Sequence, residues 1–157
     1  MPATFQLDAV DPADPEAAAL IAALDGELLE RYSGMPIHGI DAAGFVRSGG
    51  VFLVGRIDGQ AVASGAIRPI GDRVVEVKRM YVRPQFRGRG LARAMLAALE
   101  ASAAARGNGI VRLETGDGQP EAIALYSSAG YRPVPCFGEY TLDPRCRCFE
   151  KRLAVVR

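Results

Sequence analysis

The residues most able to do chemistry lie in a short segment rich in glycine and arginine, Gln85-Phe86-Arg87-Gly88-Arg89-Gly90. A strand is predicted to end at Val82 and a helix to begin near Gly90, which would direct several unpaired backbone N–H groups at one point. Gly88 and Gly90 carry no side chain to block a ligand that approaches the backbone, and both can adopt positive φ. The segment therefore predicts an anion-binding loop.

The arginines of this segment strengthen the prediction. Arg87, Arg89 and Arg93 lie at the helix start, where each cation is disfavoured by about 0.3–1 kcal/mol. A bound pyrophosphate would offset them through charge-assisted hydrogen bonds, although a solvated basic helix start is the plainer alternative. A dinucleotide-binding loop is excluded because Arg93 stands where the third glycine is needed, and a P-loop because no Gly-Lys-Ser/Thr follows.

The elements around this loop indicate a mixed α/β fold with a mostly antiparallel central sheet. Capping and first-turn residues over 11–15 and apolar residues at helical spacing predict a helix running to about Arg31, with further helices over 90–106 and 120–130 and a shorter one around 41–47. Alternation and turn signals predict strands over 4–10, 51–54, 61–70, 74–82, 110–114, 131–135 and 146–153. The strands from 51 to 82 follow one another through tight turns, such as Asp58-Gly59, and so predict an antiparallel meander.

The composition limits the classes of protein that fit. A chain of 157 residues with a formal net charge of +1 suits one domain over 1–157 and provides no general attraction for nucleic acid or an anionic membrane. No apolar run is long enough to span a bilayer and no secretory signal is visible, so we expect a cytoplasmic protein. The three cysteines, Cys136, Cys146 and Cys148, are expected to be simple thiols without a disulfide framework, and no metal site is expected.

The run Met80-Tyr81-Val82-Arg83-Pro84-Gln85-Phe86-Arg87-Gly88-Arg89-Gly90-Leu91-Ala92 resembles the acetyl-CoA-binding motif of the GNAT superfamily of N-acetyltransferases, Arg/Gln-x-x-Gly-x-Gly/Ala. A second motif follows in Gln119 to Tyr131, and the predicted element order matches the family over nearly the whole chain. The resemblance implies the GNAT fold and acetyl-CoA as cosubstrate.

The resemblance also implies which residues bind the cosubstrate. The strand end Met80, Tyr81 and Val82 would pair with the pantetheine amides as an added strand does. The loop and first helical turn would bind the pyrophosphate, chiefly through N–H groups, and the residues concerned are Arg87, Gly88, Arg89, Gly90, Leu91 and Ala92. Gln119, which stands where the family often carries Asn, and Tyr126 would contact the cofactor arm.

For catalysis, the family resemblance implies direct attack of an amine on the thioester. A lysine-like amine is only about 0.04% free at pH 7 and an α-amine about 10%, so a base is needed more for the first. Glu76, six residues before Val82, and Glu114, on the opposite strand, are both candidate bases, and an ordinary structural role stays open for each. Tyr126 matches the family tyrosine that protonates the departing thiolate, with a packed helix tyrosine as the alternative.

From the resemblance we expect the acceptor to be the primary amine of a small molecule or of an amino-acid-like compound. Lys78 and Arg79 could bind an acceptor carboxylate, and Glu139, Tyr140 and the segment from Tyr32 to Gly50 could border its pocket. A protein or peptide N-terminal or lysine acetyltransferase, and a CoA-binding sensor without turnover, are the alternatives. No nucleic-acid or membrane partner is expected, and a homodimer is left open.

Overall fold

The structure, a computed structural model, describes residues 4–32 and 41–154. Seven strands form one sheet in the order β1-β2-β3-β4-β5-β7-β6. The strands are β1 (Phe5–Val10), β2 (Val51–Ile57), β3 (Gln60–Gly71), β4 (Val74–Val82), β5 (Ile110–Gly116), β6 (Arg132–Val134) and β7 (Cys146–Arg152). The strands pair antiparallel except β4 and β5, which pair in parallel.

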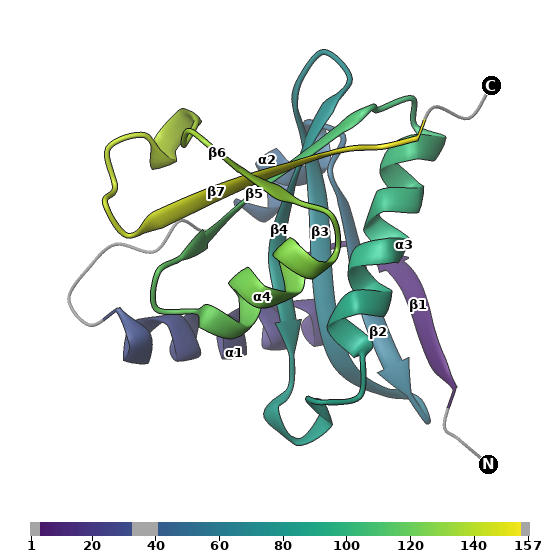
Figure 1. The fold of residues 1–157 in the computed structure, drawn as a ribbon. Helices are drawn as coiled ribbons and strands as arrows, with labels where there is room; N and C mark the ends of the chain where they lie inside the picture. Colours follow the sequence, from purple (N-terminus) through teal and green to yellow (C-terminus); the bar gives the residue numbers. More distant parts are fainter. Residues whose placement is uncertain (1–3, 33–40, 155–157) are drawn as a thin grey trace.

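Helices cover both faces of the sheet (Figure 1). Helices α1 (Pro15–Arg31) and α2 (Ala42–Arg47) lie on one face, where Leu20 and Phe45 pack against Phe52. Helices α3 (Leu91–Ala105) and α4 (Pro120–Ser128) lie on the other face, where Met95 and Leu99 belong to the larger core. Short 3₁₀ turns, η1 (Pro84–Phe86) and η2 (Gly138–Tyr140), complete the elements within the described ranges.

The element order agrees with the sequence prediction. β2, β3 and β4 form the predicted antiparallel meander. The predicted turn between the first two has positive φ at Asp58 (50°) and Gly59 (78°), as a two-residue hairpin requires. The two 3₁₀ turns were not predicted, since turns this short leave no periodic signal.

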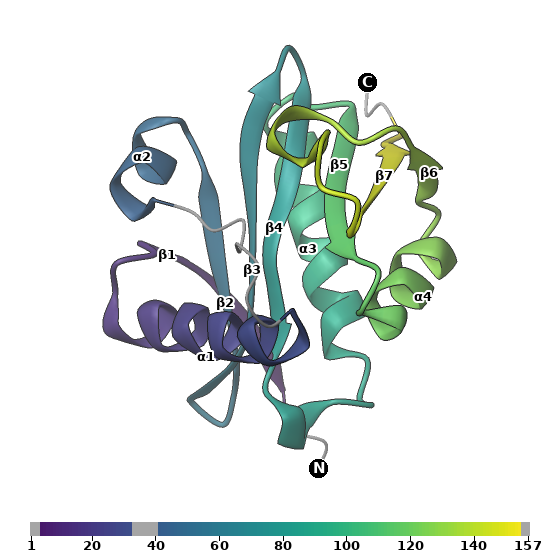
Figure 2. The ribbon, with the colours of Figure 1, turned by 90° about the vertical axis from the view of Figure 1, so that its left-hand side faces the viewer.

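The parallel strands β4 and β5 separate halfway along their length (Figure 2). Their pairing ends at Val77 and Leu113, although β4 continues to Val82 and β5 to Gly116. A bulge lies just beyond this point: Ser64 to Ala66 in β3 faces Lys78 to Tyr81 in β4, one residue more, and Arg79 has a φ of 59°. A bulge bends its strand and increases its twist, so β4 turns away from β5.

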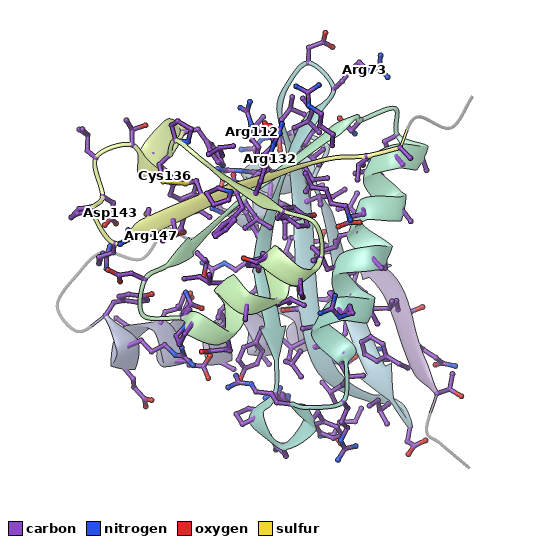
Figure 3. All side chains as sticks on the ribbon, viewed as in Figure 1. Arg73, Arg112, Arg132, Cys136, Asp143 and Arg147 are labelled. Carbon is purple, nitrogen blue, oxygen red and sulfur yellow. A yellow bond between two sulfur atoms is a disulfide. The ribbon has the colours of Figure 1, made fainter. Side chains whose placement is uncertain are left out.

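The expectation that all three cysteines are simple thiols is wrong. Cys136 and Cys148 form a disulfide, with 5.1 Å between their Cα atoms, and Cys146 is the free one. Antiparallel pairing of Val134 with Cys148 brings Cys136, two residues further along, over β7 (Figure 3). The sequence could not reveal this pairing because it depends on which strand β6 joins.

No helix in the described part of the chain is long and apolar enough to cross a membrane.

Candidate active site

A cavity of about 470 Å³ lies where β4 and β5 separate. Its wall contains residues 77–82 of β4, the loop and helix start that follow, residues 114–116 of β5, and one face of α4. Helix α1 adds Leu24, Glu27 and Leu28, and the segment before β7 adds Tyr140 and Asp143. This volume is typical of a small-molecule or cofactor site.

Backbone amides at one end of the cavity have no partner. The N–H groups of residues 88 to 93 find no hydrogen-bond acceptor in the described part of the chain, and the first intrahelical bond is from Ala94 to the carbonyl of Gly90, at 3.1 Å. Positive φ at Gly88 (80°) and Gly90 (79°) turns this run into the helix start. Consecutive amides of this kind at a helix N-terminus are suited to an anion, and anion binding by this loop stays a prediction.

The arginines of the loop contribute less charge to that site than their positions suggested. Arg87 donates to Glu27 Oε1 of α1 and to the carbonyl of Val82, both at 2.8 Å. Arg93 donates to Ser128 Oγ at 2.6 Å, and the Arg89 guanidinium lies 5.1 Å from the centre of the Phe86 ring. A carboxylate of α1 therefore offsets part of the positive charge, which the sequence could not show.

Most of the predicted site residues surround the cavity. Its wall contains Met80, Tyr81, Val82, Arg87, Gly88, Gly90, Leu91, Ala92, Gln119, Tyr126 and Glu114. Three predicted residues are absent from that wall: Arg89, which stacks on Phe86, Glu76, which is buried beside the cavity, and Glu139. Residues 33–40, part of the segment predicted to border the acceptor pocket, lie outside the described residues.

Tyr126 and Glu114 both line the cavity, and the Glu114 carboxylate is near enough to affect the Tyr126 phenol. Burial, with a smaller effect of the Glu114 carboxylate, raises the pKa of Tyr126 above its ordinary value, so the phenol stays protonated. Among described residues nothing hydrogen-bonds its hydroxyl, while its ring packs edge-on to Tyr131 at 5.9 Å. The buried thiol of Cys146 also lies beside Glu114, and burial with that carboxylate raises its pKa. Tyr126 therefore presents a protonated phenol to the cavity.

Glu76 lies at the centre of a buried polar network. Its side chain is 1% exposed, accepts a hydrogen bond from Arg68 Nε at 2.8 Å, and accepts a short one from the Tyr140 hydroxyl. Lys78 Nζ in turn donates to the same hydroxyl at 2.7 Å and lies 3.6 Å from Glu139 Oε1. Lys78 and Tyr140 line the cavity and Glu76 does not, so they separate this carboxylate from it.

The bulge in β4 is held by one contact with α1 and one with β3. Arg79 donates to Asp25 of α1 at 2.6 Å, and its carbonyl accepts a hydrogen bond from Ser64 at 2.9 Å. Its Nε is buried with no partner in the described part of the chain. A non-glycine residue with positive φ costs about 1–3 kcal/mol and persists only where its surroundings fix it. These two contacts supply that constraint, and they keep β4 apart from β5.

The end of α1 closes one side of the cavity. Arg31 forms an ion pair with Glu121 at 2.5 Å and donates to the carbonyl of Gly118 at 3.0 Å. The Tyr32 hydroxyl accepts from the Gly118 amide at 3.0 Å, and the guanidinium of Arg145 lies 5.2 Å from its ring centre. Sequence reasoning missed these residues because more than 80 residues of chain separate α1 from its partners.

Comparison with known proteins agrees with this geometry. The model of the acetyltransferase (GNAT) family matches residues 21–131. A protein of Azospirillum brasilense named IAA acetyltransferase is 36% identical over 143 residues, which are 90% of this chain and 94% of that protein.

Solved structures show the same arrangement. A Klebsiella pneumoniae protein assigned to the acyl-CoA N-acyltransferases has a TM-score of 0.81 at 37% identity and covers 96% of this chain and 99% of its own. A Salmonella typhimurium protein solved with acetyl-CoA has a TM-score of 0.73 at 18% identity, covering 98% and 96%, which is a likeness of fold. The mixed α/β fold predicted from the sequence is thus the acyl-CoA N-acyltransferase fold, and the chain belongs to the acetyltransferase (GNAT) family of enzymes.

Proposed function

We propose that this protein binds acetyl-CoA in the cavity between β4 and β5 and transfers its acetyl group to the primary amine of a small-molecule or amino-acid-like acceptor. The observation that carries this proposal is the run of amides over residues 88–93 that have no partner among the described residues and lie at one end of a cavity between two separating strands. Acetyl-CoA would supply the activated acetyl thioester, and this chain's own residues would bind it and move the protons.

The backbone of the site fits a long ligand with an anionic end. The amides of residues 88–93 would donate to the pyrophosphate, and the unpaired edge of β4 from Met80 to Val82 would hydrogen-bond an amide-containing arm. Gln119 and Tyr126, both in the cavity wall, would contact the same arm from α4. Holding the thioester between the two strands converts the reaction with a bound amine into an intramolecular one.

The acid and base roles follow from position in the cavity. Tyr126, protonated and with no hydrogen-bond partner among the described residues, would give its hydroxyl proton to the departing sulfur. Glu114 lies in the wall and could attract or deprotonate an ammonium directly, whereas Glu76 could receive a proton only through Tyr140. The two carboxylates are therefore alternative final proton acceptors.

The covered cavity favours a small acceptor over an extended peptide. Arg31 and Tyr32 bridge α1 to the loop before α4, which leaves less room for a chain passing across the cavity. The name of the relative IAA acetyltransferase supports acetyl as the transferred group. Acetylation of protein N-termini or lysines becomes an outcome of the test.

The test is thiol release from acetyl-CoA by purified protein against panels of amino acids, polyamines, aminoglycosides and peptides. We expect rapid release with one small-molecule class and slow release with peptides. Release only with peptides would move the substrate class to protein termini or lysines. Tight acetyl-CoA binding with no release for any amine would replace the enzyme by a CoA-binding sensor.

A further inference from the structure

Lys78 is placed where it can meet the acceptor amine. It follows Val77, the last residue of β4 in register with β5, and it lines the same cavity as Glu114, which follows Leu113 in β5. Its side chain is 4% exposed and belongs to the cavity wall, which means that the ammonium has given up most of its water. Lysine is almost never fully buried unless it is paired, and a buried lysine shifts its pKa readily.

One continuous hydrogen-bonded chain leads from Lys78 away from the cavity. Lys78 Nζ donates to the Tyr140 hydroxyl at 2.7 Å, and that hydroxyl donates to Glu76 Oε2. Burial, with a smaller effect of the Glu76 carboxylate, raises the pKa of Tyr140, so the phenol keeps its proton and can pass one on. Arg68 holds the far side of Glu76 in place at 2.8 Å.

The charges around Lys78 decide how readily it loses its proton. Burial lowers its pKa below the ordinary lysine value, and the nearby carboxylates oppose that shift. The charged and titratable groups that face it are Glu76, Arg68, Glu139, Arg79 and Tyr140. A lysine with a lowered pKa is neutral in a larger fraction of molecules at neutral pH, and a neutral Nζ carries a lone pair.

We propose that Lys78 accepts the proton of the acceptor amine and that Tyr140 relays a proton onward to Glu76. The acceptor N–H bond breaks and its proton binds the Lys78 Nζ lone pair. Another Nζ proton moves to the Tyr140 oxygen while the Tyr140 proton moves to Glu76 Oε2. Lys78 and Tyr140 end neutral, Glu76 ends as a carboxylic acid, and the acceptor amine is free to attack. The relay rests on the proposed function, since it needs an amine to deprotonate.

The relay differs from two plainer roles for Lys78. If Lys78 binds an acceptor carboxylate, its charge matters, and Lys78→Arg keeps that charge. If Lys78 serves only to balance Glu139, its loss affects folding rather than turnover. In the relay, Lys78→Arg and Lys78→Met fail alike, because arginine stays protonated at any working pH and methionine has no proton site.

The experiment measures kcat and KM against pH for Lys78→Met, Lys78→Arg, Tyr140→Phe and the Lys78→Met/Tyr140→Phe double variant. We expect kcat at neutral pH to fall by about 10²- to 10³-fold in each, with KM for the acceptor unchanged. The deficit shrinks as pH rises, because the acceptor then arrives already deprotonated. The double variant is no slower than the worse single variant, because the two residues act as one unit.

The chain offers a matched control in a second Tyr–Glu–Lys cluster. Tyr131 and Lys151 donate to the two oxygens of Glu100 at 2.8 and 2.9 Å, and none of the three lines the cavity. Tyr131→Phe and Lys151→Met remove the same atoms from a similar network, and they should leave the pH profile of kcat as it is in the wild type.

A second measurement does not depend on turnover. The sequence contains two lysines, Lys78 and Lys151, so a lysine-labelled sample gives two side-chain NMR signals, and Lys151→Met assigns them. The Lys78 signal should titrate below the ordinary value of about 10.4 and should move in Tyr140→Phe. A Lys78 that titrates at or above that value, a Lys78→Arg enzyme with wild-type kcat, or a Lys78→Met variant that changes KM alone would overturn the relay. If the wild type releases thiol and every variant releases it equally fast, the relay is wrong and the proposed function stands. If the wild type releases no thiol with any amine, the proposed function and the relay are both wrong.

Discussion

Replacing Gly90 by alanine tests whether the backbone of the loop binds the cosubstrate. Gly90 has a φ of 79° and precedes the first residue of α3. A Cβ added there would meet nothing within 4 Å, so the effect of the substitution is purely conformational. Gly107, beyond the other end of the same helix, has a φ of 84° and equally open surroundings, yet lies outside the cavity wall. Gly107→Ala is therefore the matched control.

The size of the effect follows from the two outcomes open to the loop. An L-residue held in the left-handed region costs about 1–2 kcal/mol. Because the exposed loop around Gly90 can rotate to avoid that cost, the following amides would turn away from the ligand. Losing one hydrogen bond to a charged group costs about 1.5–3 kcal/mol, which raises Kd by about ten- to a hundredfold.

The assay combines calorimetric titration with CoA and chemical unfolding of both variants. We expect Gly90→Ala to raise the Kd of CoA and Gly107→Ala to leave it unchanged while lowering the free energy of unfolding. Equal Kd values for the two variants would refute the reasoning, because the orientation of the amides at the helix start would then contribute nothing to binding.

Three further predictions concern the cavity and its supports. Tyr126→Phe should lower kcat by about 10²-fold with an unchanged Kd for acetyl-CoA, and unchanged turnover would remove Tyr126 from the chemistry. Gly116→Ala should raise KM for the acceptor, because the added methyl group overlaps the Tyr32 hydroxyl and breaks its hydrogen bond to the Gly118 amide. Tyr32→Phe should raise KM less, because it removes that hydrogen bond alone. An unchanged KM in both variants would mean that the end of α1 does not cover the acceptor. Thiol titration of unfolded, oxidised protein should find one free thiol per chain, Cys146, and three free thiols would contradict the disulfide. Cys136→Ser should lower the free energy of unfolding by about 2–4 kcal/mol, because it removes that disulfide.

Local patterns in the sequence were enough to predict the order of the elements and the backbone conformation of the loop glycines. Gly88 and Gly90 were expected to allow positive φ, and both have it. The strand from Val74 to Val82 was predicted with its observed bounds because alternation and flanking turns define it. Such features depend on residues within one turn or one strand, so the sequence contains what determines them.

Features that depend on distant contacts could not be predicted. Arg79 adopts its positive φ because Asp25 and Ser64 hold the bulge, and no spacing in the sequence connects these three residues. The burial of Glu76 behind Tyr140 is a second case, since it requires η2 to pack over β4. The sequence indicated Glu76 as a candidate base, but only the structure shows that other side chains separate it from the cavity.

The most direct test of the account is the response of individual backbone amides to CoA. In a titration followed by ¹⁵N NMR, the signals of residues 88–93 should shift strongly and become protected from exchange, as should those of Met80 to Val82 at the separating strand edge. Desulfo-CoA and dephospho-CoA, which both keep the pyrophosphate, should reproduce the shifts of residues 88–93. Binding that leaves these amides unchanged, or shifts that cluster outside the cavity between β4 and β5, would contradict the central claim.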